Sequence, residues 1–117
     1  MNTFLVPPKH IRLHTATLSL PRGVTVQADA PCSAAAQHLH EVLGAYGKIC
    51  RVSTAPALVA LSQKATGHGH ESYTLEVTPR GIAIVADDAA GAFYAIQTLR
   101  ELLASHGDTL PCCRITD

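Results

Sequence analysis

Charged and aromatic residues are both scarce in this sequence of 117 residues. Asp, Glu, Lys and Arg make up 15% of the chain, whereas they make up about 25% of an average soluble domain. The formal net charge is zero and no run of basic residues is present, so the sequence lacks the electrostatic signature of a protein that binds nucleic acid or an anionic membrane. Phe, Tyr and Trp total 4%, with no Trp, so the core must be aliphatic and rich in alanine.

Long hydrophobic runs are missing as well. No apolar run approaches the roughly 18 residues of a membrane-spanning helix. The opening residues, Met-Asn-Thr-Phe-Leu-Val-Pro-Pro-Lys, do not combine a charged region with a long apolar region, so we expect no signal peptide in them. We therefore expect neither a membrane partner nor a nucleic-acid partner.

Sequence patterns that carry catalysis are also missing. No serine stands in a nucleophile-elbow pattern, and no phosphate-binding loop is present. Asp87 and Asp88 are adjacent carboxylates, but they lie between a predicted strand and a predicted helix. Capping of the helix explains them there, whereas glycosidase carboxylates must flank a scissile bond in a cleft. We therefore expect no catalytic residue in this chain.

The four cysteines form no Cys-x-x-Cys pair. Cys112 and Cys113 are neighbours in a predicted strand, where apolar surroundings raise the pKa of a thiol rather than lower it. We expect reduced thiols that pack as small apolar residues. A disulfide from Cys32 or Cys50 to one of the neighbouring pair stays an alternative.

Among the seven histidines, His68 and His70 lie together in a predicted loop. They could ligate zinc with Glu71 or a cysteine, but a tetrahedral site requires about four ligands at defined spacing. His38 and His40, two residues apart on a predicted helix, point about 200° away from each other and cannot share a metal. We therefore expect no metal site and no cofactor, with His68 and His70 as weak metal candidates.

Residues 71–103, in contrast, hold a complete pattern of strand, turn, strand and helix. Apolar and polar residues alternate over 73–78, which predicts a strand with one wet face. Residues 79–81, Pro-Arg-Gly, are typical of a tight turn. Residues 82–86 are apolar on both faces, so this strand should be central in a sheet. An alanine-rich helix is predicted over 89–103.

A similar pattern occurs earlier in the chain. Pro21-Arg22-Gly23 recurs as Pro79-Arg80-Gly81 at an offset of 58 residues, and each set leads into an apolar strand and a helical pattern. We therefore predict two β-hairpins, each leading into a helix. The predicted fold is α/β, an α+β sandwich, in which a mixed and largely antiparallel sheet of about five to seven strands carries two helices on one face. The remaining predicted elements are a first helix over 33–46 and strands over 57–61 and 110–115.

The second predicted helix is apolar over about half of its circumference, more than packing on a sheet alone requires. We therefore expect the surface near Tyr94, Ala95 and Leu102 to be partly apolar and exposed. Exposed apolar patches mark contact sites, so these three residues are candidates for a contact with another domain.

Residues 72–103 resemble the N-terminal accessory domain of family 20 glycoside hydrolases, the β-N-acetylhexosaminidases. The matching features are Tyr-x-Leu-x-Val at 73–77, the glycine turn, Ala-Gly-x-Phe-Tyr at 90–94 and Gln-Thr-Leu at 97–99. The segments 6–11 and 110–117 also resemble the family's proline-rich opening and its exit strand.

The resemblance implies a single zincin-like domain over residues 1–117, without the zinc-binding motif from which that topology takes its name. It also implies that catalysis belongs to a (β/α)8 barrel expected to follow Asp117. In the family, an Asp-Glu pair on that barrel works with the substrate's own N-acetyl group. The parent would hydrolyse terminal N-acetylhexosamine residues in carbohydrates, outside the cell or in the periplasm, and this chain would pack against the barrel and support it.

Three alternatives stay open. The chain could be a stand-alone module that binds sugar or one that binds metal through His68 and His70. Sugar sites usually contain an aromatic side chain on which the sugar ring stacks, and the sequence has no Trp. It could be the accessory domain of another glycosidase family. It could also be a structural domain of an unrelated protein.

Overall fold

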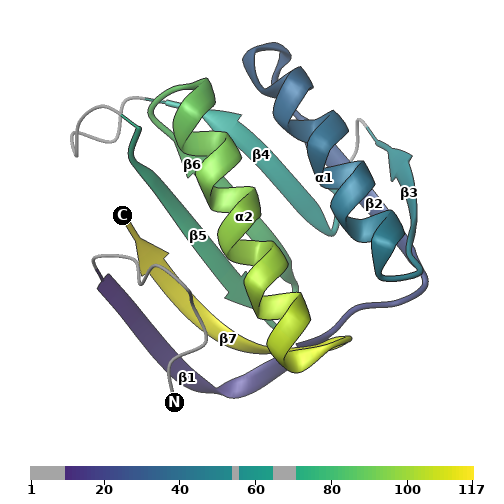
Figure 1. The fold of residues 1–117 in the computed structure, drawn as a ribbon. Helices are drawn as coiled ribbons and strands as arrows, with labels where there is room; N and C mark the ends of the chain where they lie inside the picture. The colour runs from purple at the N-terminus through teal and green to yellow at the C-terminus, as the bar shows by residue number, and fades with distance from the viewer. Residues whose placement is uncertain (1–9, 54–55, 65–70) are drawn as a thin grey trace.

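A seven-stranded mixed sheet carries two helices on one of its faces (Figure 1). The computed structural model describes residues 10–53, 56–64 and 71–117. The strand order is β1-β7-β5-β6-β4-β2-β3, with parallel pairing from β3 to β6 and antiparallel pairing from β6 to β1. The predicted mixed sheet with two helices on one face is therefore confirmed. Along the chain the elements are β1 (His10–Ser19), β2 (Gly23–Ala28), the 3-10 helix η1 (Ala30–Cys32), α1 (Ser33–Ala45), β3 (Ile49–Val52), β4 (Val59–Gln63), β5 (Tyr73–Thr78), β6 (Gly81–Ala86), α2 (Ala89–His106) and β7 (Thr109–Thr116).

The hairpin of β5 and β6 forms as predicted, and β6 is the central strand of the sheet. Its turn closes where Thr78 lies opposite Gly81. Gly81 adopts a φ of +157°, and a Cβ atom on it would lie 2.4 Å from the carbonyl oxygen of Leu58. Because a side chain does not fit there, glycine is what allows the start of β6 to pair with β4.

The other predicted hairpin, around Pro21-Arg22-Gly23, is wrong. β1 pairs antiparallel with β7 at one edge of the sheet, while β2 pairs in parallel with β3 and β4 on the other side. Both edges of β2 are therefore occupied by strands that follow it in sequence. Turn residues act locally and do not determine which strands pair, so the repeated Pro-Arg-Gly occurs in a crossover here and in a hairpin at residues 79–81.

A buried lysine holds the connection between β1 and β2 in place. The Nζ of Lys48 donates a hydrogen bond to the carbonyl oxygen of Leu20 at 3.1 Å and forms an ion pair with Oδ1 of Asp108 at 2.9 Å. The backbone N–H of Leu20 donates to the carbonyl oxygen of Asp108 at 2.8 Å. One ammonium group thus joins the β1–β2, α1–β3 and α2–β7 connections at one end of the molecule.

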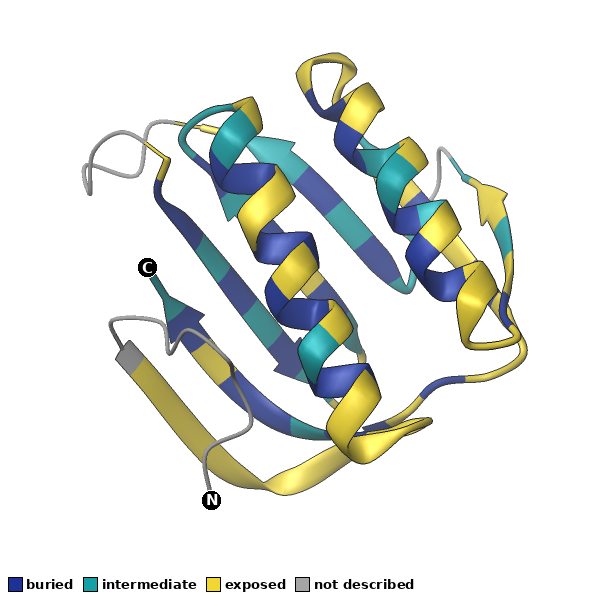
Figure 2. Cartoon of the chain, in the orientation of Figure 1, coloured by how far each residue is buried: buried dark blue, intermediate teal, exposed yellow. Residues whose placement is uncertain are grey.

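The hydrophobic core lies between the sheet and the two helices (Figure 2). Side chains on β5 alternate between buried and half-buried, as the sequence pattern predicts. Both helices turn one face toward the sheet, and α1 also packs against α2. No helix in the described part of the chain is long and apolar enough to cross a membrane. The largest fully buried side chains are those of Tyr73, Leu39, Leu43, Leu61, Leu75, Ile84, Ile96, Leu99, Leu103, Leu110, Ile115 and Val24.

Candidate interdomain surface

The start of α2 is fixed to the sheet by Asp88. Its Oδ1 accepts a hydrogen bond from the backbone N–H of Gly91 at 2.8 Å, and its Oδ2 accepts one from the backbone N–H of Glu71 at 3.0 Å. A Cβ atom on Gly91 would lie 2.3 Å from the carbonyl oxygen of Ser72, so helix and strand approach each other too closely here for a side chain. The predicted capping role of the acidic pair is confirmed, and Asp88 carries it.

Two neighbouring aromatic residues follow this junction on the outer side of α2. The side chain of Phe93 is 37% exposed and that of Tyr94 is 51% exposed. The ring of Phe93 stacks near the ring of His38 on α1, with centroids 5.5 Å apart, and Nε2 of His38 lies 3.3 Å from Nε2 of Gln97. We call His38, Phe93 and Tyr94 the aromatic patch, a surface shared by both helices.

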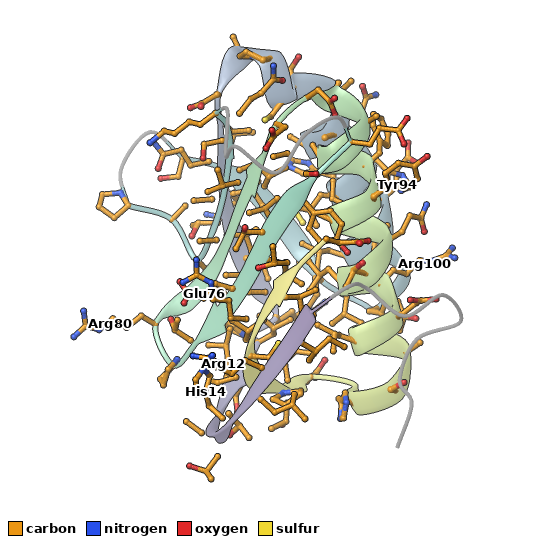
Figure 3. All side chains as sticks on the ribbon, turned by 90° about the vertical axis from the view of Figure 1, so that its left-hand side faces the viewer. Arg12, His14, Glu76, Arg80, Tyr94 and Arg100 are labelled. Atoms are coloured by element: carbon orange, nitrogen blue, oxygen red, sulfur yellow. The ribbon has the colours of Figure 1, made fainter. Side chains whose placement is uncertain are left out.

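The structure separates the three residues predicted to form a contact surface. Tyr94 is exposed and projects from α2 (Figure 3). The expectation that Ala95 and Leu102 are exposed is wrong, because both are buried within this chain. The wide apolar stripe of α2 is covered by β5, β6 and β7 on the sheet and by α1. Phe93, the other aromatic residue of α2, also lies on the outer surface.

Two buried groups that titrate, Tyr73 and Cys113, have raised pKa values. The Oη of Tyr73 and the Oγ1 of Thr98 share a hydrogen bond at 2.5 Å, and burial raises the pKa of Tyr73 to about 12. All four cysteines are free thiols. Burial raises the pKa of Cys113 to about 11, so this thiol stays protonated and weakly reactive at neutral pH.

The described residues also contain no metal site. No group of three or more His, Cys, Asp or Glu side chains in this part of the chain is arranged to hold a metal ion. The metal candidates His68 and His70 lie outside the described residues. His38 belongs to the aromatic patch, and His40 lies on a different side of α1.

These features define an α+β domain with a packed core and an exposed aromatic patch. The chain belongs to glycosyl hydrolase family 20, since the family model described as "Glycosyl hydrolase family 20, domain 2" matches residues 3–117. A curated β-hexosaminidase from Vibrio vulnificus is 34% identical over 116 residues, which span 97% of this chain and 13% of that protein.

Solved structures show the same fold. A β-N-acetylhexosaminidase from Bacteroides fragilis matches with a TM-score of 0.82 and 25% identity over 99% of this chain and 25% of its own. An exo-β-N-acetylglucosaminidase from Vibrio harveyi, solved in complex with N-acetylglucosamine, matches with a TM-score of 0.85 and 22% identity over 98% of this chain and 19% of its own. The chain therefore spans a quarter or less of each of these proteins.

Proposed function

We propose that this chain is the non-catalytic accessory domain of a β-N-acetylhexosaminidase and supports its catalytic domain by packing against it. The observation that carries the proposal is the match to domain 2 of the family over residues 3–117, combined with the small share of each relative that the chain spans. In this proposal the parent hydrolyses terminal N-acetylhexosamine residues, and the catalytic residues lie on a (β/α)8 barrel that follows Asp117.

The helix layer is the better of the two faces for such a contact. Interface centres are enriched in aromatic residues and depleted of charged ones. Residues 89–99 of α2 contain no charged side chain and include the exposed Phe93 and Tyr94. The opposite face of the sheet, on which no helix of the described residues lies, is the bare face. It has a charged row across three strands, where Arg12 lies opposite Arg114 and Arg114 opposite Glu76 (Figure 3).

The position of the last residue supports the same face. The backbone of Asp117 pairs with Tyr73 through two hydrogen bonds, at 2.9 and 3.0 Å. The residue before Tyr73 is Ser72, whose carbonyl oxygen lies against Gly91 in the first turn of α2. A domain that continues from Asp117 would therefore start close to the helix turn that holds Phe93 and Tyr94.

Substitution of Tyr94 in the longer parent protein tests the contact. We expect Tyr94→Asp to lower the melting temperature and the hydrolytic activity of the parent, because it would place a charge in the interface. The same substitution in the isolated chain should change the free energy of unfolding by less than about 0.5 kcal/mol, since Tyr94 is exposed there.

Arg80→Asp provides the matched control, because Arg80 is exposed in the β5–β6 turn on the side of the bare sheet face (Figure 3). This control should leave the parent unchanged. A parent that tolerates Tyr94→Asp as well as Arg80→Asp would show that the aromatic patch does not contact the catalytic domain.

A further inference from the structure

A cavity of about 370 Å³ lies between the first half of α1 and the ends of β2 and β3. Its volume falls within the roughly 300–1,000 Å³ of typical small-molecule sites, which are mostly apolar with a few convergent polar groups. The residues that line it are Val26, Ala28, Asp29, Ala30, Ser33, Ala36, Gln37, His40 and Val52.

The cavity lies at the carboxyl ends of the two parallel strands β2 and β3. After β2 the chain passes through η1 and α1 to β3 on one side of β2, and then returns to β4 on the other side. Both neighbours run parallel to β2. In open α/β sheets, ligands bind outside the carboxyl ends of the strands, and this cavity is lined by the carboxyl-terminal residues of β2 and β3.

One stripe of α1 forms the helical wall of the cavity. Ser33, Ala36, Gln37 and His40 have the spacing i, i+3, i+4 and i+7 of a single helix face. The small side chains of Ala28, Ala30 and Ala36 leave the space open. The helix pattern alone does not predict a site at His40, because the strands that face α1 and create the cavity are not visible in that pattern.

The lining residues include Asp, Ser and His but cannot form a catalytic triad. Ser33 and His40 are separated by seven residues on one helix, which corresponds to a rise of about 10 Å. A nucleophile and its base must be within about 3 Å. The polar groups are therefore spread along the cavity as hydrogen-bonding groups, which fits binding rather than covalent chemistry.

The charge of the lining residues indicates the class of ligand. Asp29 is the only acidic lining residue, and no Lys or Arg is among them. Although Asp29 stands at the N-cap of η1, its side chain makes no capping hydrogen bond. Its Oδ2 instead accepts a long hydrogen bond of 3.4 Å from the backbone N–H of Gln63. A carboxylate beside an apolar floor complements a positively charged group on an alkyl chain.

We propose that this cavity binds a small free alkylammonium compound, with the ammonium group at Asp29 and Ser33 and the alkyl chain against Val26, Ala36 and Val52. The proposal does not depend on the packing of a catalytic domain. NMR titration of the isotope-labelled chain with n-pentylamine at pH 7 tests it, with 1-pentanol and pentanoate as probes of the same length. We expect saturable shifts of the amide signals of Ser33, Gln37 and Val52 with the amine, weaker binding of the alcohol and no binding of the carboxylate.

Three variants make the test specific. Asp29→Asn should weaken pentylamine binding about tenfold, because it removes a charge-assisted hydrogen bond. Ala36→Leu should abolish binding by filling the cavity. Ala34→Leu, an exposed position on the same helix outside the cavity, should bind like the unmodified chain. Thermal unfolding followed by circular dichroism checks that all three variants fold.

Equal binding of the three pentyl compounds, no saturable shift, or full binding by Asp29→Asn would each overturn the proposal. Nα-acetyl-lysinamide carries the same alkylammonium group on a peptide backbone. Comparing its binding with that of pentylamine distinguishes a free amine from a lysine side chain of a partner protein as the ligand. Tighter binding of that compound than of pentylamine would overturn the assignment to a free amine.

Discussion

At the scale of single residues, Asp88 shows how one carboxylate fixes a junction. Its two oxygens accept hydrogen bonds from Gly91 in α2 and from Glu71 before β5, so it satisfies a free N–H group of the helix and one of the neighbouring segment. The sequence predicts that Asp87 or Asp88 caps this helix, because both precede it. Which of the two does so depends on backbone dihedral angles that the residue types do not determine.

Removal of the Asp88 carboxylate should therefore destabilise the domain. We expect Asp88→Ala to lower the free energy of unfolding by about 1–2 kcal/mol, and Asp88→Asn to lower it less because the amide oxygen still accepts a hydrogen bond. Urea denaturation measures both values. Wild-type stability of the alanine variant would contradict the capping role.

Burial of Tyr73 and Cys113 makes the stability of the domain sensitive to high pH. The pKa of Tyr73 is raised from 10.0 to about 12 and that of Cys113 from 9.0 to about 11, in both cases mainly by burial. Between about pH 9 and pH 12 the unfolded chain therefore binds fewer protons than the folded chain. Because of this difference, the free energy of unfolding must fall as pH rises through that window.

Tyr73→Phe isolates the contribution of the phenol. The variant loses the hydrogen bond to Thr98 and should be less stable at pH 8, but its stability should fall less steeply between pH 9 and pH 11. Urea denaturation at several pH values gives both slopes. Parallel curves for the variant and the unmodified chain would show that Tyr73 keeps an ordinary pKa in the fold.

At the scale of elements, the unit of β5, β6 and α2 follows from its sequence because its signals are local. Alternating residues, the Pro-Arg-Gly turn and an acidic cap act within a few positions of each other, and all point to the same structure. The pairing of β1 with β7 does not follow from local signals, because β7 lies about 90 residues further along the chain. Which strand pairs with β1 depends on which edge of the sheet is left open. This explains why the turn at Pro21-Arg22-Gly23 predicted a hairpin that does not form.

Two glycines in the helices test how closely elements pack. Gly91→Ala should destabilise the domain by about 2 kcal/mol, because the new Cβ would lie 2.3 Å from a backbone oxygen of Ser72. Gly44→Ala is the matched control in α1, where nothing lies within 4 Å of the added Cβ, and it should stabilise by about 0.5–1 kcal/mol. Chemical denaturation of both variants measures the contrast, and similar effects would contradict the close contact of α2 with Ser72.

At the scale of the whole molecule, one face of the sheet is covered by helices and the other is bare (Figure 3). The family and the fold class follow from sequence, because residues 73–99 hold the distinctive motifs. The burial of Ala95 and Leu102 could not be predicted from the helix pattern alone. How much apolar surface α2 buries depends on the three strands beneath it and on the second helix beside it. The cavity at Asp29 was missed for a similar reason, since its walls come from β2, α1 and β3.

Hydrolysis of an aryl N-acetyl-β-glucosaminide by the isolated chain, compared with hydrolysis by the longer parent protein that we propose, is the most direct test of the proposed role. The account predicts turnover by the longer protein and no turnover above background by residues 1–117 alone. Clear turnover by the isolated chain would contradict a non-catalytic accessory domain.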